Sequence, residues 1–303
     1  MLTRIRKRFE RWGAFLAYWI VNSLPRRHAL KLADFLAFIA YYIVLKFRKV
    51  ALDNVKIAYE REKSLAEMNE IVRLSFKCLA RTMVEFLRFP GYSHEDLKKL
   101  AKRIEGLEYL EKAMEESSGG VIGLAAHIGG WEFAGAWLEA SGYEVVAIGR
   151  EQPDQTITNL MLKLRRSSGI EHIARGKHGN KAIIETLNSK KILGLLADQN
   201  GGKKGIFVPF FGKPASCFRG PAQIALKKKV PVLMIYALWE GDYHVVKINP
   251  PITLADTGNI DDDIYENTVR FQKEIEDVVR ESPEQWFWAH KRWKTRPPDE
   301  VTE

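Results

Sequence analysis

The chain has 303 residues, of which 46% are hydrophobic and 28% are charged. This is the composition of a globular protein with ample apolar material for a core, and it excludes collagen-like, low-complexity and disulfide-framework proteins. Lys and Arg number 47 against 38 Asp and Glu, a balance that favours an anionic partner such as nucleic acid, a membrane surface or an acidic protein. Cys78 and Cys217 lie far apart without zinc-ligand spacing, so we expect reduced thiols.

Two apolar runs with basic flanks dominate the first fifty residues, at 12–24 and 35–45. Neither reaches the roughly 20 apolar residues of a spanning helix, and no small-residue cleavage site of a signal peptide follows the first run. Aromatic residues within both runs, with positive charge on every flank, are typical of helices that lie in the headgroup region of a membrane. We therefore expect residues 1–50 to form a membrane-association segment. A single tilted span and two ordinary core helices are the alternatives.

Residues 51–303 predict one α/β domain. Residues 65–89 have helical periodicity and end at Pro90. From residue 120 onward, short apolar runs alternate with amphipathic stretches, which predicts a largely parallel sheet covered by helices on both faces. The expected strands are 121–126, 144–149, 192–197, 230–238 and 243–248, and the expected helices are 131–141, 154–168, 179–189, 220–229 and 262–281.

His127 stands where a strand should end and a helix begin, in the sequence AAHIGGWEFAG. Ligands of open α/β sheets bind at this edge. Glu132 follows five residues later, and the Gly129-Gly130 turn would let its carboxylate reach the ring, fixing the tautomer and leaving a general base. The motif has no Ser or Cys, so we expect the base to deprotonate a substrate hydroxyl that attacks an activated acyl group, with the oxyanion held by N–H groups of the glycine turn.

The spacing alone carries little information, because 7 histidines and 38 acidic residues produce about one His-x4-acid pair by chance. Asp198 follows a predicted strand and is either a second site residue or an ordinary turn aspartate. Arg150 ends another strand, and Arg165 and Arg166 end a helix. Each arginine is a candidate ligand for phosphate or a thioester oxygen, or else a solvated charge at the end of its element.

Four blocks in chain order resemble the lipid A biosynthesis lauroyl/myristoyl acyltransferases, a family of glycolipid acyltransferases with a His-x4-acid box. The blocks are HIGGWE at 127–132, IGREQPDQTITNLMLKLRRSSGI at 148–170, GLLADQNGGKKGIFVPFFGKPA at 194–215 and SPEQWFWAHKRWKTRP at 282–297. The glycine turn departs from the family pattern, which often has an aromatic residue after the histidine and fewer glycines.

The resemblance implies a membrane-associated O-acyltransferase. Its donor would be an acyl-carrier-protein thioester, with acyl-CoA as the alternative, and its acceptor a hydroxyl of a lipid A precursor or related glycolipid. No metal and no cofactor is implied, and the catalytic domain would lie on the cytoplasmic side of the cell inner membrane. The implied site consists of His127 as general base, Glu132 as its orienting carboxylate, and Arg150, Arg165 or Arg166, and Asp198 as substrate-binding residues.

Three alternatives stay open at this point. The acceptor could be a mannosylated phosphatidylinositol, or it could be a phospholipid, against which the block at 282–297 argues. From a different class, a non-catalytic basic protein could bind a membrane or nucleic acid through its charge. That hypothesis leaves His127 and Asp198 at strand ends unexplained, so we expect no nucleic-acid partner.

Overall fold

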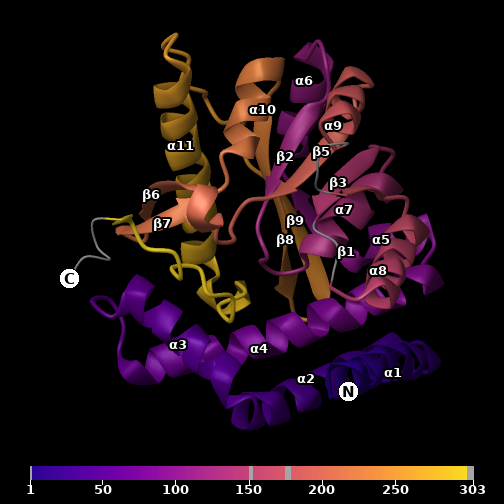
Figure 1. The fold of residues 1–303 in the computed structure, drawn as a ribbon. Coiled ribbons are helices and arrows are strands. Elements are labelled where there is room, and N and C mark those ends of the chain that lie inside the picture. The colour runs from indigo at the N-terminus through magenta and orange to yellow at the C-terminus, as the bar shows by residue number, and fades with distance from the viewer. Residues whose placement is uncertain (1, 150–152, 175–178, 299–303) are drawn as a thin grey trace.

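The computed structural model describes residues 2–149, 153–174 and 179–298. Its centre is a seven-stranded sheet in the order β1-β9-β8-β2-β5-β3-β4 (Figure 1). Neighbouring strands run parallel except β8 and β9, which are antiparallel, so the predicted, mostly parallel α/β sheet is confirmed. The strands are β1 (Ala101–Glu105), β2 (Val121–Ala125), β3 (Val145–Gly149), β4 (Glu171–Ala174), β5 (Ile192–Leu196), β8 (Val232–Glu240) and β9 (Tyr243–Ile248). A separate antiparallel pair joins β6 (Ile206–Phe210) and β7 (Lys213–Cys217).

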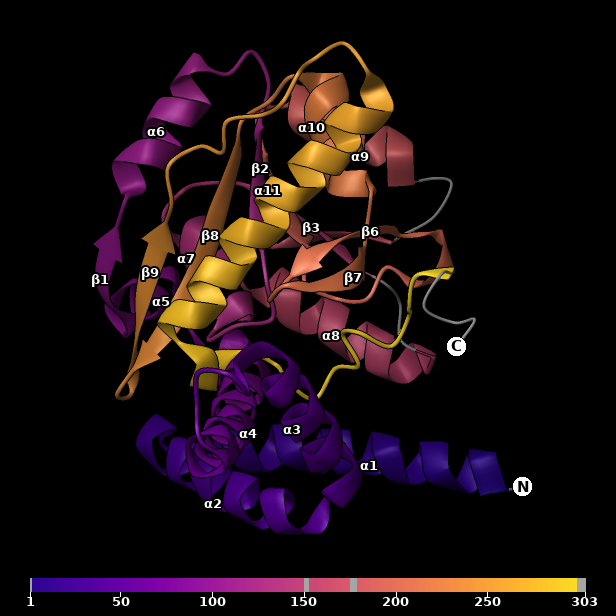
Figure 2. The same ribbon diagram turned by 90° about the vertical axis from the view of Figure 1, so that its left-hand side faces the viewer.

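Helices cover both faces of the sheet, as predicted (Figure 2). Strand β8 shows why two cores form, because alternate side chains of a strand point to opposite faces. Met234 and Tyr236 enter the core beneath one set of helices, and Ile235 enters the other core. The first face carries α9 (Gly179–Asn188), α10 (Gly220–Lys228) and α11 (Ile260–Glu281); the second carries α5 (His94–Leu100), α6 (Leu107–Glu116), α7 (Trp131–Ala140) and α8 (Gln155–Ser167).

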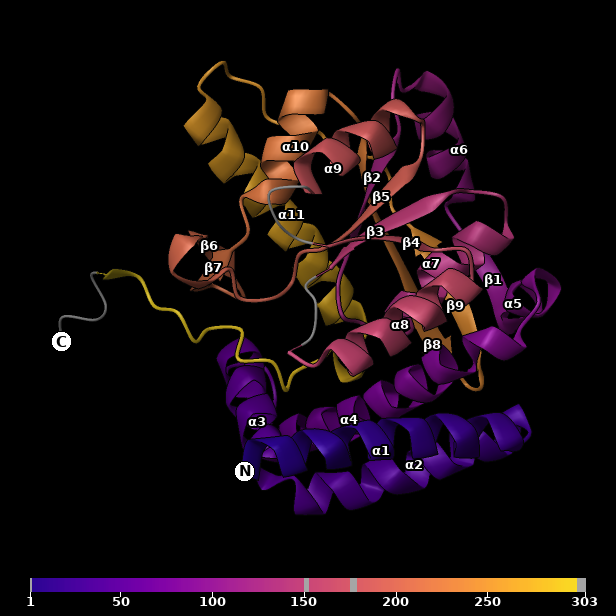
Figure 3. The same ribbon diagram turned by 45° about the vertical axis from the view of Figure 1, so that its right-hand side comes forward.

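The N-terminal helices form a layer below one end of the sheet (Figures 1 and 3). They are α1 (Leu2–Ser23), α2 (Arg26–Ile43), α3 (Leu45–Tyr59) and α4 (Leu65–Arg88), and α4 lies between the first two and the sheet. Within the described residues, no helix combines the length and the apolar character needed to cross a membrane. The expected boundary at residue 50 falls inside α3, where Ala51 and Val55 share a core with Tyr41 and with the sheet.

Candidate active site

His127 lies in the turn between β2 and α7, at the carboxyl edge of the parallel strands. Asp198 follows β5, which pairs with β2, so both residues reach the same edge. The Nδ1 atom of His127 is 2.8 Å from Oδ1 of Asp198. The Oδ2 atom accepts two further hydrogen bonds of 2.8 Å, one from the backbone N–H of His127 and one from Nε1 of Trp286. The aspartate therefore holds the ring and its backbone together.

The electrostatics of this pair favour a charged aspartate and an available base. Asp198 is buried. Burial raises its pKa, but the charge and the N–H groups of His127 have the larger, opposite effect, so the pKa is lowered overall. Burial likewise lowers the pKa of His127, but the Asp198 charge and hydrogen bond outweigh it, so the pKa is raised overall. Because a carboxylate only accepts hydrogen bonds, Nδ1 carries the proton of the neutral ring and Nε2 is the unprotonated, basic nitrogen.

The turn after His127 requires glycine at two positions. Gly129 has φ of +53°, and a Cβ there would lie 2.0 Å from the carbonyl oxygen of Ala237; a Cβ at Gly130 would lie 2.6 Å from Cε1 of His244. This close packing also occupies the N–H groups of the turn, which donate to backbone carbonyls: Ile128 to Ala126, Gly129 to Gln285 and Gly130 to Ala237. The prediction that these N–H groups hold an oxyanion is therefore wrong, since their hydrogens are already bonded.

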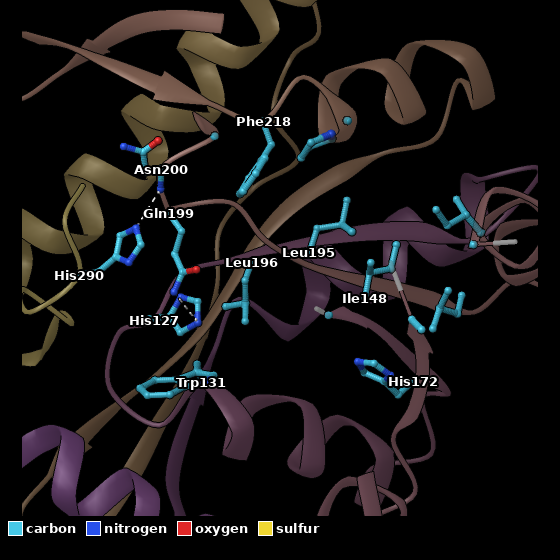
Figure 4. Close-up of a pocket in the computed structure, with 18 of the residues that line it drawn as sticks. His127, Trp131, Ile148, His172, Leu195, Leu196, Gln199, Asn200, Phe218 and His290 are labelled. Atoms are coloured by element: carbon cyan, nitrogen blue, oxygen red, sulfur yellow. Dashed lines mark hydrogen bonds between the residues drawn. The ribbon is translucent and has the colours of Figure 1, made fainter. Parts of the chain in front are cut away.

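A cavity of about 1110 Å³ opens beside His127 (Figure 4). Near the N-terminal layer its wall is apolar, with Leu79, Met83 and Phe86 from α4. Toward α10 the lining includes the cationic side chains of Lys204 and Arg219. Enzyme pockets for one drug-sized ligand span about 300–1,000 Å³, so this cavity is large enough for a long apolar group together with a polar one.

The chain matches the bacterial lipid A biosynthesis acyltransferase family over residues 2–295. It belongs to that family. A lipid A biosynthesis palmitoleoyltransferase of Escherichia coli is 23% identical over 299 residues, covering 95% of this chain and 92% of the relative. A phosphatidylinositol mannoside acyltransferase of Mycobacterium tuberculosis is 26% identical over 171 residues, 55% of this chain, and the match spans about half (54%) of that relative's length. The corresponding protein of Mycolicibacterium smegmatis is 23% identical over 235 residues, 77% of this chain and 75% of the relative.

In this member of the lipid A acyltransferase family, Glu132 does not take the place predicted for it. Among the acidic side chains of the described residues, it is Asp198 that bonds the ring of His127, whereas Glu132 pairs with Arg165. Its Oε1 lies 2.5 Å from Nη2 of Arg165, and its Oε2 lies 3.0 Å from Nε. Helix α7 begins at Trp131, so Glu132 already sits on a helical turn that faces α8, while the ring turns toward β5. The predicted contact is corrected to His127–Asp198.

The three arginines of the second block have different surroundings. Arg165 is largely buried, lines the cavity and lies over the ring of Phe86 at 5.8 Å. Burial lowers the pKa of Arg165, but the charge of Glu132 has the larger, opposite effect, so the pKa is raised overall. The guanidinium therefore stays charged and paired. Arg166 is exposed on the last turn of α8. Arg150 lies outside the described residues.

Sequence reasoning missed three residues of the site. Trp286 donates a hydrogen bond to Asp198. Gln199 brings its Nε2 to 3.4 Å from Nε2 of His127 (Figure 4). His290 lines the cavity and accepts a hydrogen bond of 3.1 Å from the backbone N–H of Asn200 (Figure 4). Their signal was the motif blocks at 194–215 and 282–297, which mark these positions without giving them a role. No group of three or more His, Cys, Asp or Glu in the described ranges is arranged to hold a metal ion.

Proposed function

We propose that the protein transfers a fatty acyl group from a thioester to a hydroxyl of a membrane glycolipid, with His127 as the general base and Asp198 as its orienting carboxylate. The observation that carries the proposal is the ring of His127, which has Nδ1 bonded to a buried carboxylate and lines a large cavity at the carboxyl edge of the sheet. Ligands of this class of fold bind at that edge.

The reaction follows from the unprotonated Nε2 atom of His127. As the acceptor hydroxyl attacks the thioester carbonyl carbon, its proton passes to Nε2 and a tetrahedral oxyanion forms. The oxyanion collapses, the C–S bond breaks, and the leaving sulfur takes the proton from the imidazolium. Asp198 stabilises the imidazolium between these steps through its charge at 2.8 Å. The nucleophile is the acceptor's own oxygen, so the steps need no metal or further cofactor.

The donor in this proposal is an acyl-carrier-protein thioester, with acyl-CoA as the second candidate. Both carry phosphate, which the cationic side chains of Lys204 and Arg219 at the α10 end of the cavity suit. The acceptor is a lipid A precursor or a related glycolipid such as a mannosylated phosphatidylinositol. Relatives named for both acceptors match the chain at similar identity, and the apolar wall from α4 suits an acyl chain.

We further propose that the N-terminal layer docks on the cytoplasmic face of the inner membrane. Large apolar side chains of α1 and α2 are exposed there, including Trp12 at 66%, Trp19 at 68% and Phe35 at 60%. Between residues 11 and 50 the chain has seven Lys and Arg but one Asp and no Glu. Exposed aromatic side chains beside excess positive charge match an anionic headgroup region.

Mass spectrometry of lipids tests the catalytic proposal. Detergent-purified protein is incubated with an acyl-carrier-protein thioester or acyl-CoA and with candidate glycolipids. We expect one acyl mass on one lipid class, and a loss of at least about 10²-fold in rate for His127→Ala. His94→Ala, at an exposed histidine of α5, is the matched control. A folded His127→Ala protein with full acyl-transfer activity would show that the base is misassigned. A non-catalytic binding protein predicts instead that no lipid gains an acyl mass with either protein.

Vesicle flotation tests the docking proposal. Deleting residues 1–50 is unsuitable, because Val21 and Tyr41 are buried in cores shared with the rest of the chain. Point variants avoid this problem. We expect Trp19→Glu with Phe35→Glu to reduce flotation with anionic vesicles severalfold, whereas Ile260→Glu, at a site 58% exposed on α11, leaves it unchanged. Equal losses in both proteins would show that flotation does not depend on the N-terminal layer.

A further inference from the structure

The loop after β5 reaches both nitrogens of the His127 ring. Asp198 contacts Nδ1, and the next residue, Gln199, places its side-chain Nε2 3.4 Å from Nε2 of His127 (Figure 4). Since Nδ1 carries the hydrogen, Nε2 of the neutral ring accepts, and the carboxamide of Gln199 donates to it. The nitrogen that must take the substrate's proton is therefore already occupied in the free protein.

The contact is built so that it can open. At 3.4 Å it is near the long limit of a hydrogen bond, and among the described residues the carboxamide of Gln199 has no other hydrogen-bond partner in the structure. The residues on either side are held in place: the carboxylate of Asp198 accepts three hydrogen bonds, and the backbone N–H of Asn200 donates to His290 at 3.1 Å. The side chain can thus leave His127 by rotation alone, without movement of the loop.

We propose that Gln199 is a positioning residue that occupies Nε2 of His127 until an acceptor hydroxyl displaces it, and so limits hydrolysis of the bound thioester. This inference rests on the proposed function. In the unwanted reaction a water oxygen attacks the thioester carbonyl, its proton passes to Nε2, the C–S bond breaks, and free acid and thiol leave. Water cannot use the base while the carboxamide of Gln199 holds it. A hydroxyl bound through the rest of its lipid has a far higher local concentration than a free solute, so it can compete.

Chemical modification measures the occupancy of Nε2 without any need for enzyme activity. Diethyl pyrocarbonate acylates neutral imidazole, and peptide mass spectrometry reports each histidine separately. The full-length protein in detergent is treated at a pH where the rate at His127 no longer rises with pH. Losing a hydrogen bond of ordinary net strength frees the nitrogen about fivefold more often, so we expect about fivefold faster modification at His127 and no change at the exposed His94.

Two substitutions separate hydrogen bonding from simple shielding. Gln199→Met keeps the length and approximate volume of the side chain without a donor, and Gln199→Asn keeps the donor but is one methylene too short to reach. If the hydrogen bond holds Nε2, both variants accelerate modification. If bulk alone protects the ring, only Gln199→Asn does so, and the proposal is overturned. Unchanged rates in both variants overturn it as well.

Partition of the donor gives the second readout. Without an acceptor lipid, we expect Gln199→Met to hydrolyse the acyl thioester about fivefold faster than the unchanged protein. With acceptor present, its KM for the acceptor should fall by a similar factor, because the hydroxyl no longer competes with the carboxamide. Faster modification in a protein that acylates no lipid would mean that the Gln199 contact is real but the proposed reaction is wrong. Normal acyl transfer with unchanged hydrolysis and modification would refute the role of Gln199 alone.

Discussion

Asp198→Asn replaces one carboxylate oxygen by an NH₂ group and keeps the shape of the side chain. Oδ2 of Asp198 accepts two fixed donors, the backbone N–H of His127 and Nε1 of Trp286, so the asparagine oxygen must take that position. Its NH₂ group then faces Nδ1 of His127. The NH₂ group and the N–H at Nδ1 are both donors and cannot bond to each other, so the hydrogen of the neutral ring must move to Nε2. An Nε2 atom that carries a hydrogen can no longer accept the proton of the substrate.

The expected loss of kcat for Asp198→Asn is about 10⁴-fold, the scale measured when a hydrolase triad loses its tautomer in the same way. This equals roughly 5.5 kcal/mol of transition-state stabilisation at 1.36 kcal/mol per decade. The assay measures initial rates of acyl transfer, with ¹⁵N spectra of the ring to report the tautomer and thermal unfolding to confirm the fold. Asp277→Asn, on the exposed face of α11, is the control.

A folded Asp198→Asn protein within tenfold of the normal rate would refute the assignment of Asp198. So would a spectrum in which Nδ1 of His127 keeps its hydrogen. If Glu132→Gln lost far more rate than Asp198→Asn while both proteins stayed folded, the acid of the His-x4-acid box would have to act on the ring directly, through a conformation other than the one described.

Three further predictions concern buried charges. Glu132→Gln leaves the largely buried Arg165 without its counter-charge and should destabilise the fold by about 3–5 kcal/mol; adding Arg165→Met should recover much of this loss in thermal unfolding, and no recovery would argue against a buried pair. Burial raises the pKa of Glu85, but the nearby His244 ring, 3.6 Å away, and the hydrogen-bonded Arg26 guanidinium lower it from 4.5 to about 2. The unchanged protein should therefore have a free energy of unfolding about 3 kcal/mol larger than that of Glu85→Gln. This difference should be complete above pH 4.5 and disappear as the pH falls toward 2. A difference that stays constant with pH would contradict the prediction. Finally, kcat/KM should fall toward acid as His127 gains a proton, with an apparent pKa above the ordinary 6.5 because Asp198 outweighs burial; a midpoint below 6.5 in the pH profile would contradict this.

Strands with buried faces on both sides were predictable from sequence, and an exposed edge strand was not. The strands around the site, β2 and β5, agree with prediction to within one residue because their apolar runs are unbroken. The edge strand β1 was missed because its three central residues are exposed and lack an apolar pattern. The β6–β7 pair was missed as well, since each strand contains a proline, Pro209 and Pro214, a residue that counts against a strand.

The position of the candidate site was predictable, but its pairing was not. His127 and Asp198 were both expected at strand ends, and strand ends of a parallel sheet share one edge. Choosing the partner of the ring requires the strand order, which puts β2 beside β5 and joins residues 71 positions apart. Spacing along the chain favoured Glu132 instead, because Glu132 is near His127 in sequence. Sequence separation does not show in which direction the His127 ring points from its turn.

The failed expectation of an oxyanion site in the glycine turn has the same physical origin. A helix N-terminus attracts anions when its N–H groups lack acceptors, and local sequence shows only acceptors close in the chain. Here the carbonyl oxygens of Gln285 and Ala237 bond to the N–H groups of Gly129 and Gly130, and both come from segments more than 100 residues away. Buried backbone groups are nearly always paired, so a glycine turn wedged against a strand uses its N–H groups for the fold. Such a motif predicts an oxyanion site only where tertiary contacts leave those hydrogens facing the cavity.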